Sequence, residues 1–414
     1  MDSEDPDGAK TSRYPSGSSQ RSVLVVVFTT ILIDWVGFSV LIPVLPLYAE
    51  RLGAGPMQIG LLLTVYALAQ LFFLPVWGWV SDRVGRRPVI LVSLFGTALS
   101  FGFLIQAESV EMIFAARALA GFFAASIGTA QAVITDVTSE EDRAGGMGVI
   151  GAAFGLGMVL GPAMGGFLAR ISVAAPFQAI IVLALLNLAL AWWRLPETHH
   201  PEPGETRWRE LGIAFVPTPL RLVAAVHGRR IGLFLTLFFF QFTAFAVLEG
   251  QITYYLSAAH GADELDVALV FAWIGLVLAL TQGVALRRLV PLFGEERLVM
   301  LGLAAMGLGL IGVAMVGSLG WFYLVGTLIA FGNGVAFPTF TGLYSKACEA
   351  DQAGELLAQS QSMATTGRIV GPVAAGWMME HGALGTPFLI AGAVMFGCLI
   401  CFRLARRILI EGLP

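Results

Sequence analysis

Long apolar segments separated by short polar turns run along almost the whole chain. A helix needs about 20 apolar residues to cross the hydrocarbon core of a bilayer. Twelve segments reach about that length, and they predict an all-α membrane protein with twelve transmembrane helices. They lie at 22–48, 57–81, 87–106, 109–136, 144–170, 173–195, 231–257, 265–287, 297–317, 320–346, 356–380 and 384–408.

One long polar segment, residues 196–230, divides these helices into two sets of six. The pattern therefore predicts a six-helix bundle at 22–195, a cytoplasmic linker at 196–230 and a second six-helix bundle at 231–410. Residues 1–21 are rich in acidic residues, Ser, Gly and Pro, which is typical of a disordered tail. Two interpretations of the linker stay open: a plain connection, or in part an amphipathic helix on the inner leaflet.

The positive charges predict the orientation of these helices. With a cytoplasmic N-terminus, 20 of the 24 Lys and Arg residues fall on cytoplasmic tails and loops. Such an excess marks the cytoplasmic side of a membrane protein. Because twelve is even, both termini are expected in the cytoplasm, with the chain multi-pass in the inner (cytoplasmic) membrane.

A short motif occurs once in each half. "GLGMVLGPAMGGF" (155–167) and "TTGRIVGPVAAGW" (365–377) share three glycines and a proline at an offset of 210 residues. Six predicted helices separate the copies, so both insert the same way up. Two parallel, pseudo-symmetric halves are typical of transporters whose site lies between them.

Composition excludes several classes of function. Hydrophobic residues make up 57% of the chain and charged residues 13%, against roughly a quarter in soluble domains. The net charge of −4 gives no basis for a nucleic-acid partner. No GxSxG or HExxH motif occurs, the five histidines lie in loops or at helix ends, and Cys398 and Cys401 have no second ligand pair. We therefore expect no enzyme, no metal site and no cofactor.

One turn is unusually charged. "GWVSDRVGRRPV" (78–89) places an acid and three arginines between the second and third predicted helices. A glycine allows close helix approach, and a carboxylate can accept hydrogen bonds from a helix N-terminus. The candidate residues of a conformational latch are Gly78, Asp82, Arg83, Gly85, Arg86 and Arg87. The alternative is that these charges only hold the turn in the cytoplasm, a role that would not require Asp82.

This turn resembles the signature of the major facilitator superfamily. "GLGMVLGPAMGG" resembles that family's antiporter motif, "ARALAGFFAASIG" (116–128) resembles its fourth-helix motif, and "LIDWVGFSVLIPVLPLY" resembles the first helix of drug:proton antiporters. The resemblance implies the major facilitator fold and alternating access. It also implies that Gly78 and Asp82 meet the eleventh helix of the other half and close the cytoplasmic side. The equivalent turn at 287–297 lacks the acid, so the latch is expected on one side only.

The glycines of the antiporter motif recur on one face of the fifth predicted helix. The residues are Gly157, Gly161, Pro162, Gly165 and Gly166. We expect this stripe to pack between the two halves on the outer side, and the resemblance implies that it favours export. Ordinary packing of small residues is the alternative.

Four ionisable residues lie inside predicted helices, where charges are costly and are functional candidates. Asp34 lies about 18 Å from the cytoplasmic end of the first helix, and Arg117 lies at a similar depth on the fourth. We expect the two side chains to interact and Asp34 to carry the transported proton, because burial favours its neutral form and Arg117 its charged form. A static ion pair is the alternative.

Glu249 and Arg368 are less defined. Glu249 is a second candidate for proton coupling or a glutamate at the outer interface, and Arg368 is expected to pair with a carbonyl, Glu249 or an anionic substrate group. The predicted substrate-binding set is completed by side chains that are individually more often packing residues. Beside Asp34 and Arg368 these are Phe38, Gln131, Phe242, Phe245, Tyr254, Asn333, Phe337 and Phe340.

Together these features predict a monomeric proton-coupled antiporter that exports lipophilic or amphipathic drug-like molecules. Its partners would be that substrate, protons and the lipid bilayer. The alternatives are a transporter that moves amphiphilic lipids between leaflets and an uptake symporter or facilitator for a small polar solute. The first predicted helix resembles that of tetracycline exporters, and that resemblance implies a histidine within the membrane and an acid in the ninth helix. Here the ninth predicted helix carries no acid and the histidines lie in loops or at helix ends, so tetracycline is expected to be a poor substrate.

Overall fold

The computed structural model describes residues 18–138, 143–199, 229–346 and 353–410, and within these ranges the regular structure is helical. The first half contains α1 (Ser18–Arg51), α2 (Pro56–Val84), α3 (Arg86–Ile105), α4 (Val110–Phe122), α5 (Ser126–Val137), α6 (Arg143–Ala169) and α7 (Ala175–Arg194). The second half contains α10 (Arg229–His260), α11 (Glu264–Leu280), a π-helical segment (Thr281–Ala285), α12 (Leu286–Phe293), α13 (Glu295–Met315), α14 (Leu319–Lys346), α15 (Ala353–His381), α16 (Thr386–Leu404) and α17 (Arg406–Ile410).

Eleven helical segments in the described residues are long and apolar enough to cross a membrane. They coincide with eleven of the twelve predicted spans; α4 with α5, and α11 with the π segment and α12, each form one of them. The remaining prediction, 356–380, falls on α15, a 29-residue helix that is not among the eleven. Its sequence is less apolar and includes Thr365, Thr366 and Arg368. The twelfth span therefore stays a prediction.

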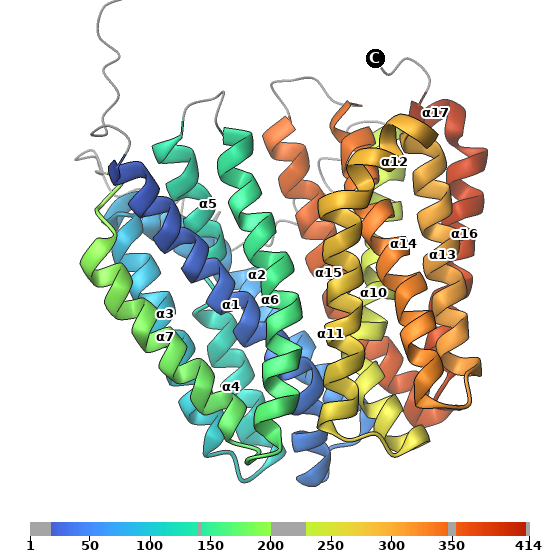
Figure 1. The fold of residues 1–414 in the computed structure, drawn as a ribbon, viewed down its shortest axis with the longest axis horizontal. Helices are drawn as coiled ribbons and strands as arrows, with labels where there is room; N and C mark the ends of the chain where they lie inside the picture. The colour runs from blue at the N-terminus through green and yellow to red at the C-terminus, as the bar shows by residue number, and fades with distance from the viewer. Residues whose placement is uncertain (1–17, 139–142, 200–228, 347–352, 411–414) are drawn as a thin grey trace, which may run out of the picture.

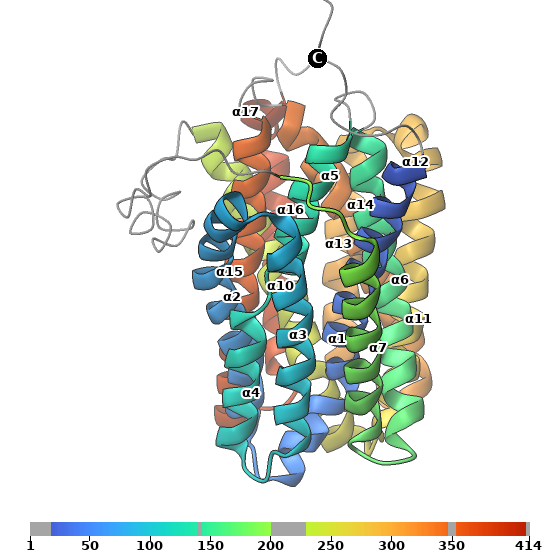
Figure 2. The ribbon, with the colours of Figure 1, turned by 90° about the vertical axis from the view of Figure 1, so that its left-hand side faces the viewer.

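The helices run side by side in two groups (Figure 1). Helices α1–α7 form one group and α10–α17 the other, and Figure 2 shows α3 and α7 on the outer flank of the first group. Within the groups, α1 packs on α6 and α10 packs on α15. Between them, α6 packs on α11 and α2 packs on α15. The α10–α15 pair of the second group repeats the α1–α6 pair of the first, as the sequence motif predicts.

The glycine stripe of α6 packs differently from the prediction. A Cβ at Gly157 would lie 2.6 Å from the Cβ of Trp35, and a Cβ at Gly165 would lie 2.9 Å from the carbonyl oxygen of Val40. Gly161 likewise faces Ser39, so this stripe joins α6 to α1 within one group. Only Gly166 faces the other group, where it meets Ala268 of α11; Pro162 lies within α6.

The same arrangement is found at the second copy of the motif. Gly367 and Gly371 of α15 face Thr243 of α10, which belongs to the same group. Gly376 faces Pro56 of α2, which belongs to the other group. Glycine is needed at both crossings because helix backbones can approach closely only where side chains are small.

The described polar contacts between the two groups lie from mid-helix toward one end of the bundle, which we call the Arg51 end. It is the lower end in Figure 1, and there Arg51 of α1 forms an ion pair with Glu264 of α11. Thr253 donates to the carbonyl oxygen of Ile42 at 2.8 Å. These contacts join the groups at the Arg51 end.

Two further side chains cross between the groups. Thr64 of α2 donates to the carbonyl oxygen of Ile369 at 2.9 Å. Gln251 of α10 donates to the carbonyl oxygens of Pro56 at 3.0 Å and Pro372 at 3.2 Å. Because Gln251 is buried, its amide links α2, α10 and α15 away from water.

Candidate functional site

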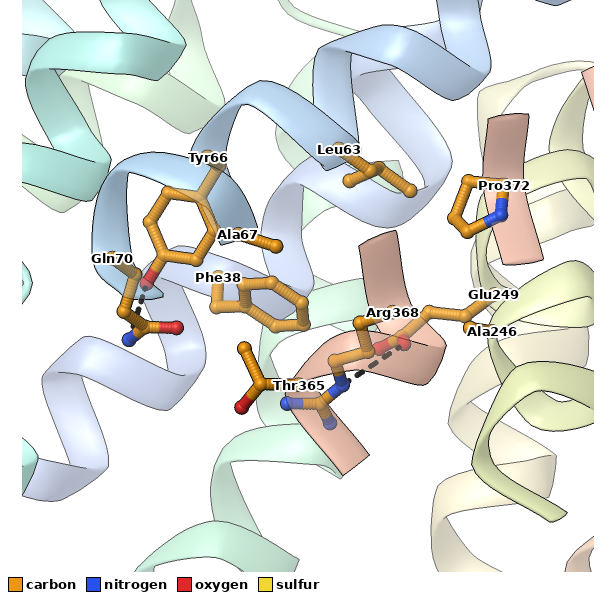
Figure 3. A pocket seen from close by; sticks show the side chains of 10 residues that line it. All are labelled: Phe38, Leu63, Tyr66, Ala67, Gln70, Ala246, Glu249, Thr365, Arg368 and Pro372. Carbon is orange, nitrogen blue, oxygen red and sulfur yellow. Dashed lines mark hydrogen bonds and ion pairs between the residues drawn. The ribbon is translucent and has the colours of Figure 1, made fainter. Parts of the chain in front are cut away.

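A cavity lies between the two groups near the middle of the helices (Figure 3). Its space for the centre of a water molecule is about 20 Å³, which is enough for about one water. The lining comes from α1, α2, α10 and α15: Phe38, Leu63, Tyr66, Ala67, Gln70, Ala246, Glu249, Thr365, Arg368 and Pro372. In this conformation the cavity is too small for a drug-sized molecule.

Arg368 and Glu249 supply opposite charges to this cavity. Arg368 Nε lies 3.7 Å from Glu249 Oε2, and the Glu249 side chain is only 5% exposed. Glu249 is therefore buried and ion-paired, and the outer-interface alternative is not what the structure shows. The Arg368 guanidinium also lies 5.7 Å from the ring centre of Phe38 and 5.8 Å from that of Trp35, so it reaches across to α1.

The fourth predicted span is broken close to Asp34. Helix α4 ends at Phe122 and α5 begins at Ser126, and the hydroxyl of Ser126 donates a hydrogen bond to Asp34 Oδ2. Backbone groups freed at a break inside a membrane need other partners. Trp77 Nε1 donates to the carbonyl oxygen of Phe122 at 2.6 Å. The break therefore places a hydroxyl beside the half-buried Asp34, and a carbonyl that it frees accepts a hydrogen bond from Trp77.

One further side chain satisfies the backbone at this break. Ser93 of α3 donates to the carbonyl oxygen of Phe123 at 2.5 Å and accepts from the amide of Ala125 at 3.3 Å. Helices α3 and α2 thus hold the interruption in place from two sides.

Arg117 is buried, but not against Asp34. Its guanidinium carbon lies 4.4 Å from the ring centre of Tyr66, and its side chain is 3% exposed. Within the described residues, Arg117 Nε and Nη2 have no hydrogen-bond partner and no ion pair joins Arg117 to Asp34. The predicted direct contact is thus not formed in this conformation. The two charges instead share Tyr66, which interacts electrostatically with both and with Arg368.

Most other residues of the predicted substrate set lie outside the cavity. Phe242 packs edge-on against Phe337 at 5.1 Å, and Asn333 accepts a hydrogen bond from Gln241 at 3.3 Å. The remaining four are scattered: Phe340 is buried, Phe245 and Tyr254 are partly buried in packing clusters, and Gln131 is exposed. Phe38 and Arg368 are the members of the set that line the cavity, and Asp34 does not line it but interacts electrostatically with Tyr66, which does.

The charged turn between α2 and α3 forms a local network. Arg86 Nη1 lies 2.5 Å from Asp82 Oδ1, and Arg86 Nε lies 3.2 Å from Asp136 Oδ2 of α5. Gly85 has φ of +105°, and a Cβ there would collide with the carboxylate of Glu197. That carboxylate accepts hydrogen bonds from the amides of Arg86 and Arg87, which begin α3.

The predicted contact of this turn with α15 is not formed in the described residues. The Asp82 side chain is 60% exposed, and a Cβ added to Gly78 would meet no described atom within 4 Å. Arg83 stacks on Trp79 at 4.0 Å. This is expected where the groups touch at the Arg51 end, because α2 approaches α15 at 56–64 rather than near residue 78.

Sequence reasoning missed four polar residues at this site: Tyr66, Gln70, Ser126 and Thr365. Tyr66 and Gln70 are the polar pair on one face of an otherwise apolar stretch of α2, at the i and i+4 positions that share a helix face. That spacing is a signal in the sequence that could have identified them. Ser126 carried no such signal, because its position depends on the break after α4.

Comparisons with known proteins agree with this architecture. The model of the Major Facilitator Superfamily matches residues 27–363 and 252–411. Tetracycline resistance protein, class C, of Escherichia coli is 31% identical over 402 residues, which cover 94% of this chain and 97% of that protein. Major facilitator superfamily domain-containing protein 10 of Mus musculus is 28% identical and covers 87% of this chain and 88% of that protein.

A solved structure shows the same fold. The human organic anion transporter MFSD10 (TETRAN) superposes with a TM-score of 0.70 at 24% identity, covering 92% of this chain and 99% of that one. The two helix groups with a cavity between them, the charged turn after α2 and the family match lead to one conclusion: the chain belongs to the Major Facilitator Superfamily and is a multi-pass membrane transporter.

Proposed function

We propose that the chain is a proton-coupled antiporter that exports lipophilic or amphipathic drug-like molecules by alternating access. The observation that carries this proposal is the position of Asp34, a carboxyl group beside a broken helix near the middle of the bundle, next to Tyr66 and the cavity. Relatives named tetracycline resistance proteins support a drug as the exported molecule.

The chemistry at Asp34 suits reversible protonation. The ionised form is stabilised by the hydrogen bond from the Ser126 hydroxyl. The neutral form is favoured by removal from water. Asp34 has no direct ion-pair partner among the described residues. Protonation of Asp34 therefore does not leave a buried cation without its counter-charge.

Alternating access requires the two groups to separate at one end and meet at the other. Here the groups are joined at the Arg51 end, and the Asp82 turn at the opposite end is exposed. We assign the Asp82 end to the cytoplasm from the distribution of Lys and Arg, so this conformation is the one that receives substrate from inside. In the outward-facing state Asp82 would meet the N-terminus of α15 and form the latch. The two bundles, 22–195 and 231–410, would move as rigid bodies. Residues 1–21 and the linker at 196–230 would lie in the cytoplasm.

The test uses the Asp34→Asn variant in proteoliposomes. A drug-susceptibility panel in an efflux-deficient host first selects a transported compound, and two modes are then measured: transport driven by a pH gradient, and exchange of labelled for unlabelled compound without a gradient. We expect Asp34→Asn to lose gradient-driven transport and to retain exchange, because only proton movement is blocked.

Glu108→Gln, at an exposed position in the turn between α3 and α4, is the matched control and should behave as wild type. Wild-type gradient-driven transport by Asp34→Asn would remove Asp34 from this role. Translocation of fluorescent phospholipids by the wild type without drug transport would favour the lipid transporter, and uptake of a polar solute with the gradient would favour the symporter.

A further inference from the structure

The outer flank formed by α3 and α7 carries an apolar groove that the transport cycle proposed above does not use. Its volume is about 550 Å³. The lining side chains are Leu91, Val92 and Phe95 of α3 and Leu185, Leu188, Ala189 and Trp192 of α7. Both helices are membrane spans on the outside of the bundle (Figure 2), so this groove faces the hydrocarbon of the bilayer.

One end of the groove carries positive charge. The guanidinium carbon of Arg87 lies 5.4 Å from the ring centre of Trp192, and its Nη2 donates to the Trp192 carbonyl oxygen at 2.6 Å. Arg87 Nε has no hydrogen-bond partner among the described residues. Arg194, one residue beyond the exposed Trp193, is also exposed. The Arg87 guanidinium therefore stands where the groove reaches the end of α3 and α7, whereas Arg194 lies about 180° around α7 from the residues that line the groove.

The acidic residues nearby are engaged elsewhere. Asp82 and Asp136 both pair with Arg86. Glu197 accepts hydrogen bonds from the amides of Arg86 and Arg87 at the start of α3. In the described part of the chain, Arg87 belongs to no ion pair, so no carboxylate of the protein neutralises its charge at the groove.

The length of the groove fits one leaflet. From Arg87 to Phe95 is eight residues of helix, or about 12 Å at 1.5 Å per residue. The hydrocarbon of one leaflet is about 15 Å thick, half of the roughly 30 Å core. A chain lying in the groove with its polar end at Arg87 would therefore reach nearly to the middle of the bilayer.

We propose that this groove binds one acyl chain of an anionic phospholipid whose phosphate-bearing headgroup contacts Arg87. Lipid that merely surrounds the protein would show no preference for headgroup charge. A juxtamembrane cation near an anionic lipid contributes about 1 kcal/mol, which is about a fivefold change in binding at 1.4 kcal/mol per tenfold. This inference is independent of what the transporter carries.

The test counts retained lipids by native mass spectrometry. The full chain is reconstituted in nanodiscs of phosphatidylcholine and phosphatidylglycerol with identical acyl chains in equal amounts, and is then released. We expect the wild type to retain phosphatidylglycerol over phosphatidylcholine by fivefold or more. Arg87→Gln should reduce this preference about fivefold, and Ala189→Trp, which fills the groove, should reduce retention of both lipids.

Matched controls lie on the far flank of the molecule. Arg403→Gln and Ala393→Trp change exposed residues of α16 and should leave retention unchanged. Equal retention of the two lipids by the wild type would overturn the proposal, as would equal effects of the α7 and α16 variants. If Ala189→Trp is not monodisperse, Arg87→Gln against Arg194→Gln decides alone, because both remove one positive charge at the same end of the bundle and only Arg87 adjoins the groove.

Discussion

The buried pair of Arg368 and Glu249 makes a quantitative prediction about stability. Arg368→Gln leaves the Glu249 carboxylate, which is 5% exposed, without the cation 3.7 Å away. At an effective dielectric constant of about 20, the charges attract by roughly 4.5 kcal/mol at that distance. Removing one partner of a buried pair typically costs about 3–5 kcal/mol. We therefore expect Arg368→Gln to destabilise the protein by about 3 kcal/mol.

The assay is thermal unfolding of the purified protein in detergent. Each half has about the size of a domain whose midpoint falls by roughly 2–4 °C per kcal/mol, so a fall of about 6–12 °C is expected. The double variant Arg368→Met with Glu249→Leu removes both charges and should recover most of that loss, because well-packed apolar residues often replace a buried pair without cost. The exposed pair gives the control: Arg51 is 54% exposed, and Arg51→Gln should cost less than about 1 kcal/mol.

The comparison of Arg368→Gln with the double variant decides between a stranded charge and lost packing. If the double variant is as unstable as Arg368→Gln alone, the carboxylate is not the cause and the reasoning is refuted. A cost for Arg51→Gln equal to that for Arg368→Gln would refute the dependence on burial.

Three further predictions concern helix packing. Gly161→Val should sharply reduce the yield of folded protein by gel filtration, because its side chain would meet the backbone of α1, whereas Gly155→Ala, which meets no described atom within 4 Å, should be neutral or slightly stabilising. Trp77→Phe removes the 2.6 Å hydrogen bond at the α4–α5 break and should lower stability by about 1–3 kcal/mol in the same melting assay; an unchanged midpoint would mean that the carbonyl finds another partner. Gln251→Leu should increase the distance between spin labels placed on loops of the two groups at the Arg51 end, since two carbonyl acceptors lose their donor; unchanged distances would show that helix packing alone holds this end.

The sequence predicted elements well where composition alone decides them. Hydropathy located eleven spans, and the glycine–proline motif predicted a repeat that the pairs α1–α6 and α10–α15 bear out. It did not reveal the interruption between Phe122 and Ser126, because the residues there are as apolar as an unbroken helix. Small residues likewise indicate a close neighbour but not which one, so the stripe on α6 was placed against the wrong helix.

The candidate site shows the limit of reasoning from depth. Asp34 and Arg117 were placed at the same level of the membrane, and in the structure both interact electrostatically with Tyr66. Their direct contact was not formed, because depth leaves the rotation of each helix about its own axis open. Glu249 was one of three expected partners of Arg368, and the structure forms that pair; the choice among the three depends on the crossing of α10 and α15.

Apart from the exposed Arg51–Glu264 ion pair, the described hydrogen bonds between the groups go to main-chain oxygens, those of Ile42, Pro56 and Ile369. A carbonyl oxygen is present whichever residue occupies its position, so these contacts do not depend on the identity of the accepting side chain. The cavity wall beside them can therefore change its chemistry during evolution while the closure is kept. Residues that line the cavity and contacts that close the protein are in this way specified separately. A transporter of this fold can therefore change its substrate by substitutions in the cavity while it keeps the contacts that join the two groups.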